Sequence, residues 1–200
     1  LQTPHSVPAP FTTDTLDLDA TDLRMLELSL QTMTPQSLAH LRGVKIGRKT
    51  QSLTRNGATY NTGGPNQYGL TLHDGTERSV LYFQSLYVND PDLFRGSTAA
   101  NARPDVTMKM LHELGHAVGY DAGIEAAFTT WLASHAQTAP TTYAASANVE
   151  RFPEFFGLYH SDPHFLCGRY PQVYAWFEVL ASTGSPPAAS ARLATPTCPA

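Results

Sequence analysis

The feature that most constrains this chain is a short motif in its second half, His112-Glu113-Leu114-Gly115-His116. The motif lies in a segment whose apolar residues recur every four positions, which predicts a buried helix. Two histidines four residues apart lie one turn apart on the same helix face. Both imidazoles can therefore reach one zinc ion, and Glu113 can act as general base on a water bound to that ion. The small Gly115 is expected where another backbone or a substrate comes close.

A catalytic zinc site needs a third protein ligand and one open position. In one class of zinc peptidases the motif continues to a third histidine, but Ala122 stands at that position here. That class also has a Met-turn after the motif, and all four methionines of this chain precede His116. Glu125 can serve only if the backbone reverses directly after Gly119. Two further acids remain as candidates, Glu150 and Glu154.

Glu150 and Glu154 are spaced i and i+4 in an aromatic-rich helical pattern over 148–159. The aromatic residues of this pattern are expected to pack the segment against the helix that carries His112 and His116: Phe152, Phe155, Phe156 and Tyr159. A carboxylate that faces such a packed interior is costly unless it is paired or bound to metal. A zinc ion would give one of the two acids that partner.

Together these segments resemble the anthrax-lethal-factor-like zinc metallopeptidases, the group that includes the secreted Pro-Pro endopeptidases. The resemblance covers residues 105 to about 174. It implies a gluzincin-like site for one zinc ion (Zn²⁺), with Glu150 as the third ligand beside the two histidines and Glu154 behind the ligands. It also implies that Tyr143, seven residues before Glu150, directs its hydroxyl to the zinc. Pro153 departs from the family pattern, so we expect this helix to begin near Glu150 or to kink there.

The resemblance implies a zinc endopeptidase acting on a peptide or protein substrate. Glu113 would take a proton from the zinc-bound water and pass it to the leaving amine, while zinc and Tyr143 stabilise the oxyanion. Cleavage next to proline is a form that this activity could take. Two alternatives to the endopeptidase stay open: a zinc hydrolase for a different amide substrate, such as a cell-wall peptide, and an inactive metal-binding interaction protein. We expect structural or surface roles for the neighbouring His160 and His164.

The composition of the chain further narrows the class of protein. The chain has 200 residues, 42% of them hydrophobic, and a net charge of −4. This supports one domain with a core, and the lack of a basic run disfavours nucleic acid as a partner. No apolar stretch approaches 18 residues, so no membrane span is expected. The chain begins with Leu1, which we interpret as a processed product, and we expect a monomer.

The two cysteines, Cys167 and Cys198, do not form a C-x-x-C motif. A disulfide between them would hold the Pro/Ala/Ser-rich tail, 182–200, against the domain and contribute about 3.5 kcal/mol. Such a bond needs an oxidising compartment, so we expect secretion.

The expected fold class is α+β, with a small mixed sheet and helices followed by a mainly helical half and the zinc in the cleft between them. A loose arm, 1–14, precedes a metallopeptidase domain, 15–181. Predicted helices cover 21–33, 106–118, 125–135, 148–159 and 171–181. Predicted strands cover 44–49, 86–88 and a hairpin of 68–72 and 78–83 around Asp74-Gly75. Loops are predicted at 56–67, 94–103 and 137–147, the last carrying Tyr143.

Overall fold

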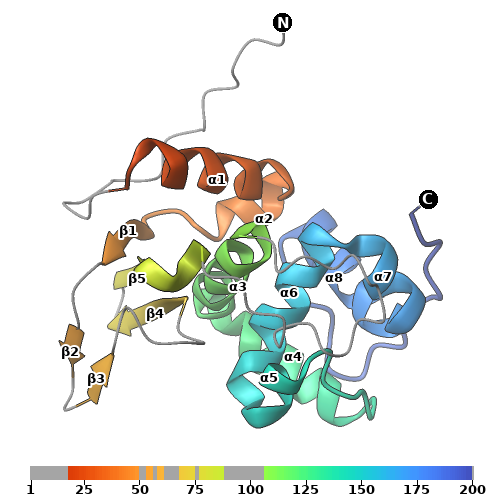
Figure 1. Cartoon of the computed structure of the whole chain (residues 1–200). Helices are drawn as coiled ribbons and strands as arrows, with labels where there is room; N and C mark the ends of the chain where they lie inside the picture. The colour runs from red at the N-terminus through yellow and green to blue at the C-terminus, as the bar shows by residue number, and fades with distance from the viewer. Residues whose placement is uncertain are drawn as a thin grey trace, which may run out of the picture.

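The computed structural model describes residues 18–49, 53–55, 58–60, 68–74, 77–87 and 106–199. The chain is an α+β protein in which a small sheet and two helices precede a mostly helical half (Figure 1). The predicted fold class is confirmed at this level. The predicted arm 1–14, the loop 94–103 and the first residue of the family resemblance, Asp105, lie outside the described residues.

The first helix, α1 (Ala20–Gln31), begins where Asp19 and Asp22 cap each other: each carboxylate accepts a hydrogen bond from the other residue's backbone N–H. The predicted helix 21–33 is thus confirmed to within two residues at its end. Its expected apolar stripe is buried except at Leu23, which is 46% exposed. A short helix that was not predicted, α2 (Pro35–Ala39), follows because proline fits a first helical turn.

Among the described residues, the main sheet has three strands in the order β1-β5-β4. Strand β5 (Glu77–Phe83) pairs in parallel with β1 (Lys45–Lys49) and antiparallel with β4 (Gly69–Asp74), so the sheet is mixed as predicted. The predicted hairpin is confirmed. Asp74 pairs with Glu77, so Asp74 lies in strand β4 rather than in the expected two-residue turn, and Gly75 lies outside the described residues.

Two predictions near the sheet were wrong. Strands β2 (Leu53–Arg55) and β3 (Ala58–Tyr60) form a separate antiparallel pair, so part of the expected loop 56–67 is a strand. The expected strand 86–88 is replaced by a 3-10 helix, η1 (Gln84–Tyr87), in which Leu86 is fully buried; Val88 lies outside the described residues. Burial of an apolar run does not by itself distinguish a strand from a helical turn.

Helix α3 (Val106–Gly119) carries the histidine motif and lies between the sheet and the helices that follow α3 along the chain (Figure 1). It packs against α1 and β4 on one side and against α6 (Arg151–Ser161) on the other. The other elements of this half are η2 (Asp121–Gly123), α4 (Ile124–Ala133), α5 (Thr142–Ser146), η3 (Asn148–Glu150), α7 (Pro163–Arg169) and α8 (Pro171–Thr183). Helix α5 occupies part of the predicted loop 137–147, and α7 was not predicted.

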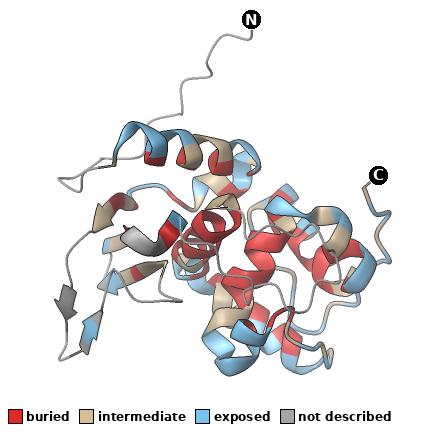
Figure 2. Ribbon diagram, in the orientation of Figure 1, coloured by how far each residue is buried: buried red, intermediate tan, exposed pale blue. Residues whose placement is uncertain are grey.

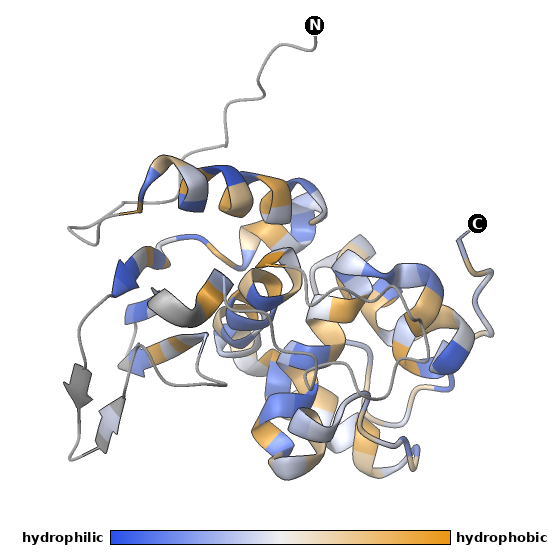
Figure 3. Ribbon diagram, viewed as in Figure 1, coloured by the Kyte–Doolittle hydropathy of each residue, from blue (hydrophilic) through white to orange (hydrophobic). Residues whose placement is uncertain are grey.

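Buried residues gather along α3 and α6 (Figure 2), and both helices carry hydrophobic residues (Figure 3) that belong to one core cluster. The prediction that Phe152, Phe155 and Phe156 are inward is confirmed, since all three are fully buried. Tyr159 was expected to face α3, but its ring stacks 5.4 Å from that of Phe177 on α8. A Cβ at Gly115 would lie 2.9 Å from the Pro153 Cα, so another backbone does come close at this glycine.

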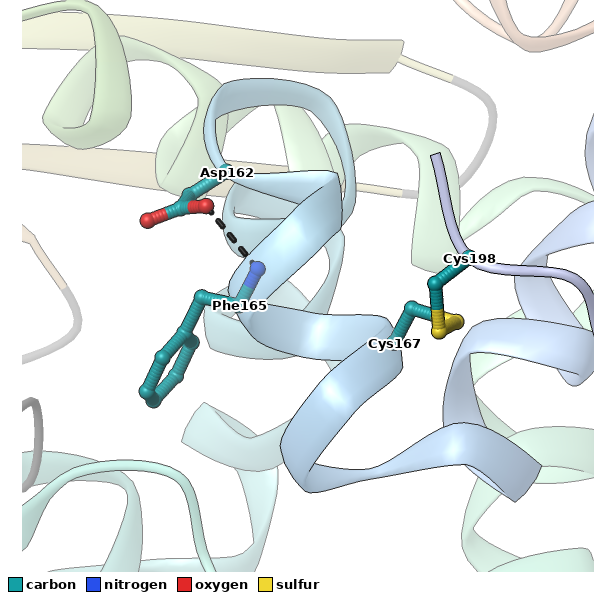
Figure 4. Close-up of a disulfide and its surroundings, with 4 residues drawn as sticks. All are labelled: Asp162, Phe165, Cys167 and Cys198. Atoms are coloured by element: carbon teal, nitrogen blue, oxygen red, sulfur yellow. Dashed lines mark hydrogen bonds between the residues drawn. A yellow bond between two sulfur atoms is a disulfide. The ribbon is translucent and has the colours of Figure 1, made fainter. Parts of the chain in front are cut away.

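The predicted disulfide joins Cys167 of α7 to Cys198 near the end of the chain (Figure 4). Residues 185–199 form no helix or strand, and the disulfide holds this segment against the helical half. The start of α7 is fixed by Asp162, whose carboxylate accepts the backbone N–H of Phe165 (Figure 4). Among the helices of the described ranges, none has both the length and the apolar content to cross a membrane.

Candidate metal centre

The two histidines of the motif face the same side of α3, one turn apart. Their rings meet edge to face with centroids 5.0 Å apart, and His112 is 8% exposed. Helix α3 ends at Gly119, where the chain turns sharply, so the ring of His116 lies in the last turn of the helix. This spacing presents both Nε2 atoms to one point, as the sequence predicted.

Glu150 approaches that point from the start of the helix that packs against α3. Its Oε2 lies 3.1 Å from His112 Nε2 and 3.2 Å from His116 Nε2. Glu150 ends η3, and α6 begins at Arg151, so Pro153 falls in the first turn, where no helical hydrogen bond is lost. The expected start of this helix near Glu150 is confirmed.

Glu154, one turn further along α6, holds the back of the first imidazole. Its Oε2 lies 2.7 Å from His112 Nδ1, and its Oε1 accepts a hydrogen bond of 2.8 Å from the Thr141 hydroxyl. The side chain is fully buried. In the neutral imidazole, a carboxylate at Nδ1 fixes the proton there and leaves the Nε2 lone pair directed at Glu150.

This arrangement requires a positive charge between the ligand atoms. A bare Nε2 and a carboxylate oxygen 3.1 Å apart repel each other unless a proton or a cation lies between them. Burial lowers the pKa of His112, but hydrogen bonds to Glu150 and Glu154 outweigh it and raise the pKa to about 10. Burial raises the pKa of Glu150, and the two imidazoles outweigh that effect and lower it well below its usual range.

The distances fit a metal ion in place of the proton. Ligand atoms at 2.0–2.1 Å from a tetrahedral zinc lie about 3.3 Å from one another, close to the 3.1 and 3.2 Å found here. One ligand atom from each of three residues, His112, His116 and Glu150, lies within 4.8 Å of the others. These three residues could hold a metal ion.

Glu113 points away from α6 toward strand β4. The Thr71 hydroxyl lies 2.8 Å from its backbone oxygen and 2.9 Å from its Oε2. Gly69 lies against the same side chain, where a Cβ would be 2.6 Å from Glu113 Cγ. Glu113 is therefore held by the sheet, while its neighbour His112 points toward His116 and Glu150.

Tyr143 lies beside the ligands, on the short helix α5 rather than in a loop. Its ring centroid is 5.7 Å from that of His112, and the residue is 37% exposed. Burial first, and then the charge and hydrogen bond of Glu150, raise the pKa of Tyr143 well above its usual value. The phenol keeps its proton at neutral pH and remains a hydrogen-bond donor.

Three nearby residues had no assigned role in the sequence. Thr71 and Thr141 hold the two buried acids, and Tyr120 stacks between the rings of His116 and His73 at centroid distances of 6.2 and 5.1 Å. A threonine before a short helix is a recognisable N-cap signal, which fits Thr141. The partners of Thr71 and Tyr120 depend on long-range contacts between the sheet and the α3 region, which no local sequence pattern indicates.

The reversal that the sequence required for Glu125 does occur. The backbone turns at Ala122 and Gly123, both with positive φ, and a Cβ at Gly119 would lie 3.0 Å from the Glu125 Cβ. Burial raises the pKa of Glu125, and the charge of His116 opposes this. Glu125 is nevertheless not one of the residues whose ligand atoms converge.

The two later histidines are not part of the group. His160 is buried, its ring donates to the Thr32 carbonyl at 3.1 Å, and burial lowers its pKa to about 4. His164 is exposed on α7. Both lie as expected for structural and surface residues.

Comparison with known proteins gives no match to a family model, to a curated protein or to a solved structure. The fold and the site define the class directly: an α+β protein with a possible metal site built from two histidines and a glutamate.

Proposed function

We propose that this protein is a zinc-dependent endopeptidase of the anthrax-lethal-factor-like kind, secreted into an oxidising compartment. The observation that carries the proposal is the pairing of a convergent His112, His116 and Glu150 group with a separately held carboxylate on the intervening residue, Glu113. A site that merely stores metal has no use for that acid. The disulfide between Cys167 and Cys198 supports secretion.

His112, His116 and Glu150 would hold the ion, and Glu154 orients His112 through Nδ1. When bound, zinc lowers the pKa of a coordinated water to about 7 and polarises a carbonyl. Glu113 takes the proton of the attacking water and returns it to the leaving amine.

Tyr143 donates its phenolic proton to the oxygen on which negative charge develops. Its raised pKa supports this, because a donor must keep its proton at working pH. One such donor is typically worth about 10²–10³ in rate.

Strand β4 supports the binding of an extended peptide. It ends the three-stranded sheet in the described part of the chain and packs against α3. An extended substrate pairing with such a strand gains main-chain hydrogen bonds. Proline next to the cleaved bond is the specificity that the family resemblance suggests.

The deciding experiment is metal analysis of the purified protein together with cleavage of a peptide library, with and without a chelator. We expect about one zinc per chain and cleavage that the chelator abolishes. Glu113→Gln should retain zinc and lose hydrolysis, and Tyr143→Phe should lower turnover with the fold intact. Zinc binding without cleavage of any peptide would point instead to another amide substrate or to a binding protein. Full turnover by Glu113→Gln would refute the mechanism.

A further inference from the structure

Strand β4 presents two residues to Glu113 from one face. Gly69 and Thr71 are two apart, so they lie on the same side of the strand. Both meet the Glu113 side chain, which is only 7% exposed. Helix α3 thus supplies the acid, and a strand 42 residues earlier determines where it points.

Thr71 fixes one oxygen of the carboxylate. Its hydroxyl is 2.9 Å from Glu113 Oε2 and 2.8 Å from the Glu113 backbone oxygen, so it reaches the side chain and the main chain of one residue. A hydroxyl has a single proton to donate, and a hydrogen bond to a charged acceptor is roughly twice as strong as one to a neutral acceptor. Thr71 therefore restrains Glu113 at Oε2.

Gly69 leaves the space in which the rest of the carboxylate lies. A Cβ at this position would be 2.6 Å from Cγ, 2.8 Å from Cδ and 2.9 Å from Oε1 of Glu113. Any other residue at position 69 would push the side chain from its place. A glycine within a strand often marks such a close approach.

We propose that Gly69 and Thr71 are positioning residues for Glu113: they hold Oε2 and leave Oε1 as the oxygen that receives the proton of the attacking water. The proposal rests on the proposed function, since it assigns Glu113 the role of base. It adds that the geometry of the base is determined by the sheet rather than by the zinc helix.

The test compares four variants in the zinc-loaded protein with a peptide from the library. Thr71→Val removes the hydroxyl at nearly constant volume, and Thr71→Ser keeps it. Gly69→Ala adds the obstructing methyl group, and Gly168→Ala is its control, because a Cβ at Gly168 meets nothing within 4 Å.

We expect Thr71→Val and Gly69→Ala to lower kcat about 10–100-fold with KM changed less than about twofold, because a misplacement of about 1 Å can reduce the rate about 10²-fold. Thr71→Ser should recover to within about threefold of the wild type, and Gly168→Ala should be unaffected. Crystal structures of the metal-free variants give a second readout, in which the Glu113 carboxylate should be displaced in Thr71→Val and Gly69→Ala only.

The proposal is overturned if Glu113→Gln is inactive while Thr71→Val and Gly69→Ala keep wild-type kcat, or if the carboxylate is unmoved in both crystal structures. Equal losses in Thr71→Ser and Thr71→Val also overturn it, because the hydroxyl would then not be the cause. Should Thr71→Val not fold, Gly69→Ala and Thr71→Ser still decide the outcome. Wild-type turnover by Glu113→Gln would refute the proposed function itself, a distinct result.

Discussion

Replacing Gly115 by alanine tests whether the metal group depends on the close contact between α3 and α6. The new Cβ would lie 2.9 Å from the Pro153 Cα, 3.1 Å from Phe156 Cδ1 and 3.2 Å from Phe156 Cβ. The nearest of these is a backbone atom of α6, which cannot rotate away as the end of a flexible side chain can. Helix α6 must therefore retreat or tilt.

The size of the movement follows from the contact distances. Ordinary van der Waals contact begins at 3.4 Å, so the Pro153 backbone must retreat by about 0.5 Å. Glu150 directly precedes α6 and would move with it. Metal–ligand distances tolerate about 0.2 Å, so we expect Zn²⁺ affinity to fall about tenfold or more, which is about 1.4 kcal/mol.

Stability without metal provides an independent check. Alanine gains about 1 kcal/mol over glycine within a helix, and overpacking costs about 1–3 kcal/mol. The metal-free variant should therefore be as stable as the wild type or less stable by up to about 2 kcal/mol. Chelator competition measures the zinc affinity, and urea unfolding measures the stability. Gly168→Ala is again the control. Unchanged zinc affinity with a metal-free protein stabilised by the full 1 kcal/mol would refute the reasoning.

Three further outcomes are expected. Thr141→Val removes the hydroxyl that holds Glu154 and should weaken Zn²⁺ binding about 10–100-fold in chelator competition; wild-type affinity would show that Glu154 needs no such support. The pKa of His160 is about 4 in the folded protein and about 6.5 when unfolded, so the unfolded chain binds the proton first as pH falls. The contribution of His160 to the unfolding free energy should thus be constant above about pH 6.5 and fall by about 3 kcal/mol towards pH 4. The difference in unfolding free energy between the wild type and His160→Gln should show this fall, and a difference that does not change with pH would contradict it. Reduction of Cys167–Cys198, which closes a loop of 31 residues, should lower the unfolding free energy by about 3.5 kcal/mol, measured by urea unfolding with and without reductant; an unchanged midpoint would mean that the tail contributes nothing.

The parts of the fold that could be predicted were those with a local signal. The periodic apolar residues of α3 and α8 and the proline in the first turn of α6 depend on neighbours a few positions away. The cysteine pair was predictable because the chain has only two cysteines. The short helix α5 was missed, since five residues rich in threonine, alanine and serine resemble a loop when their partners are unknown.

The contacts that fix the site are mostly long-range, and this limits prediction from sequence. Thr71 meets Glu113 only because β4 pairs with β5 in one register and the hairpin packs on α3. A shift of one residue in that register would turn Thr71 to the opposite face. The approach of Glu125 to the site depends on Ala122 at φ 47°, a conformation that alanine rarely adopts and that no local pattern indicates.

Helix direction gives one more reason why the ligand group forms where it does. Backbone carbonyls make the end of a helix electronegative, which favours positive charge there, and the start of a helix favours negative charge, each by about 0.3–1 kcal/mol. His116 lies in the last turn of α3, whereas Glu150 and Glu154 lie at the start of α6. The end of α3 therefore favours a cation beside His116, and the start of α6 favours the ionised carboxylates of Glu150 and Glu154. The sequence contains this information, because the arrangement needs only histidines late in one helix, acids early in a later helix, and packing between the two helices.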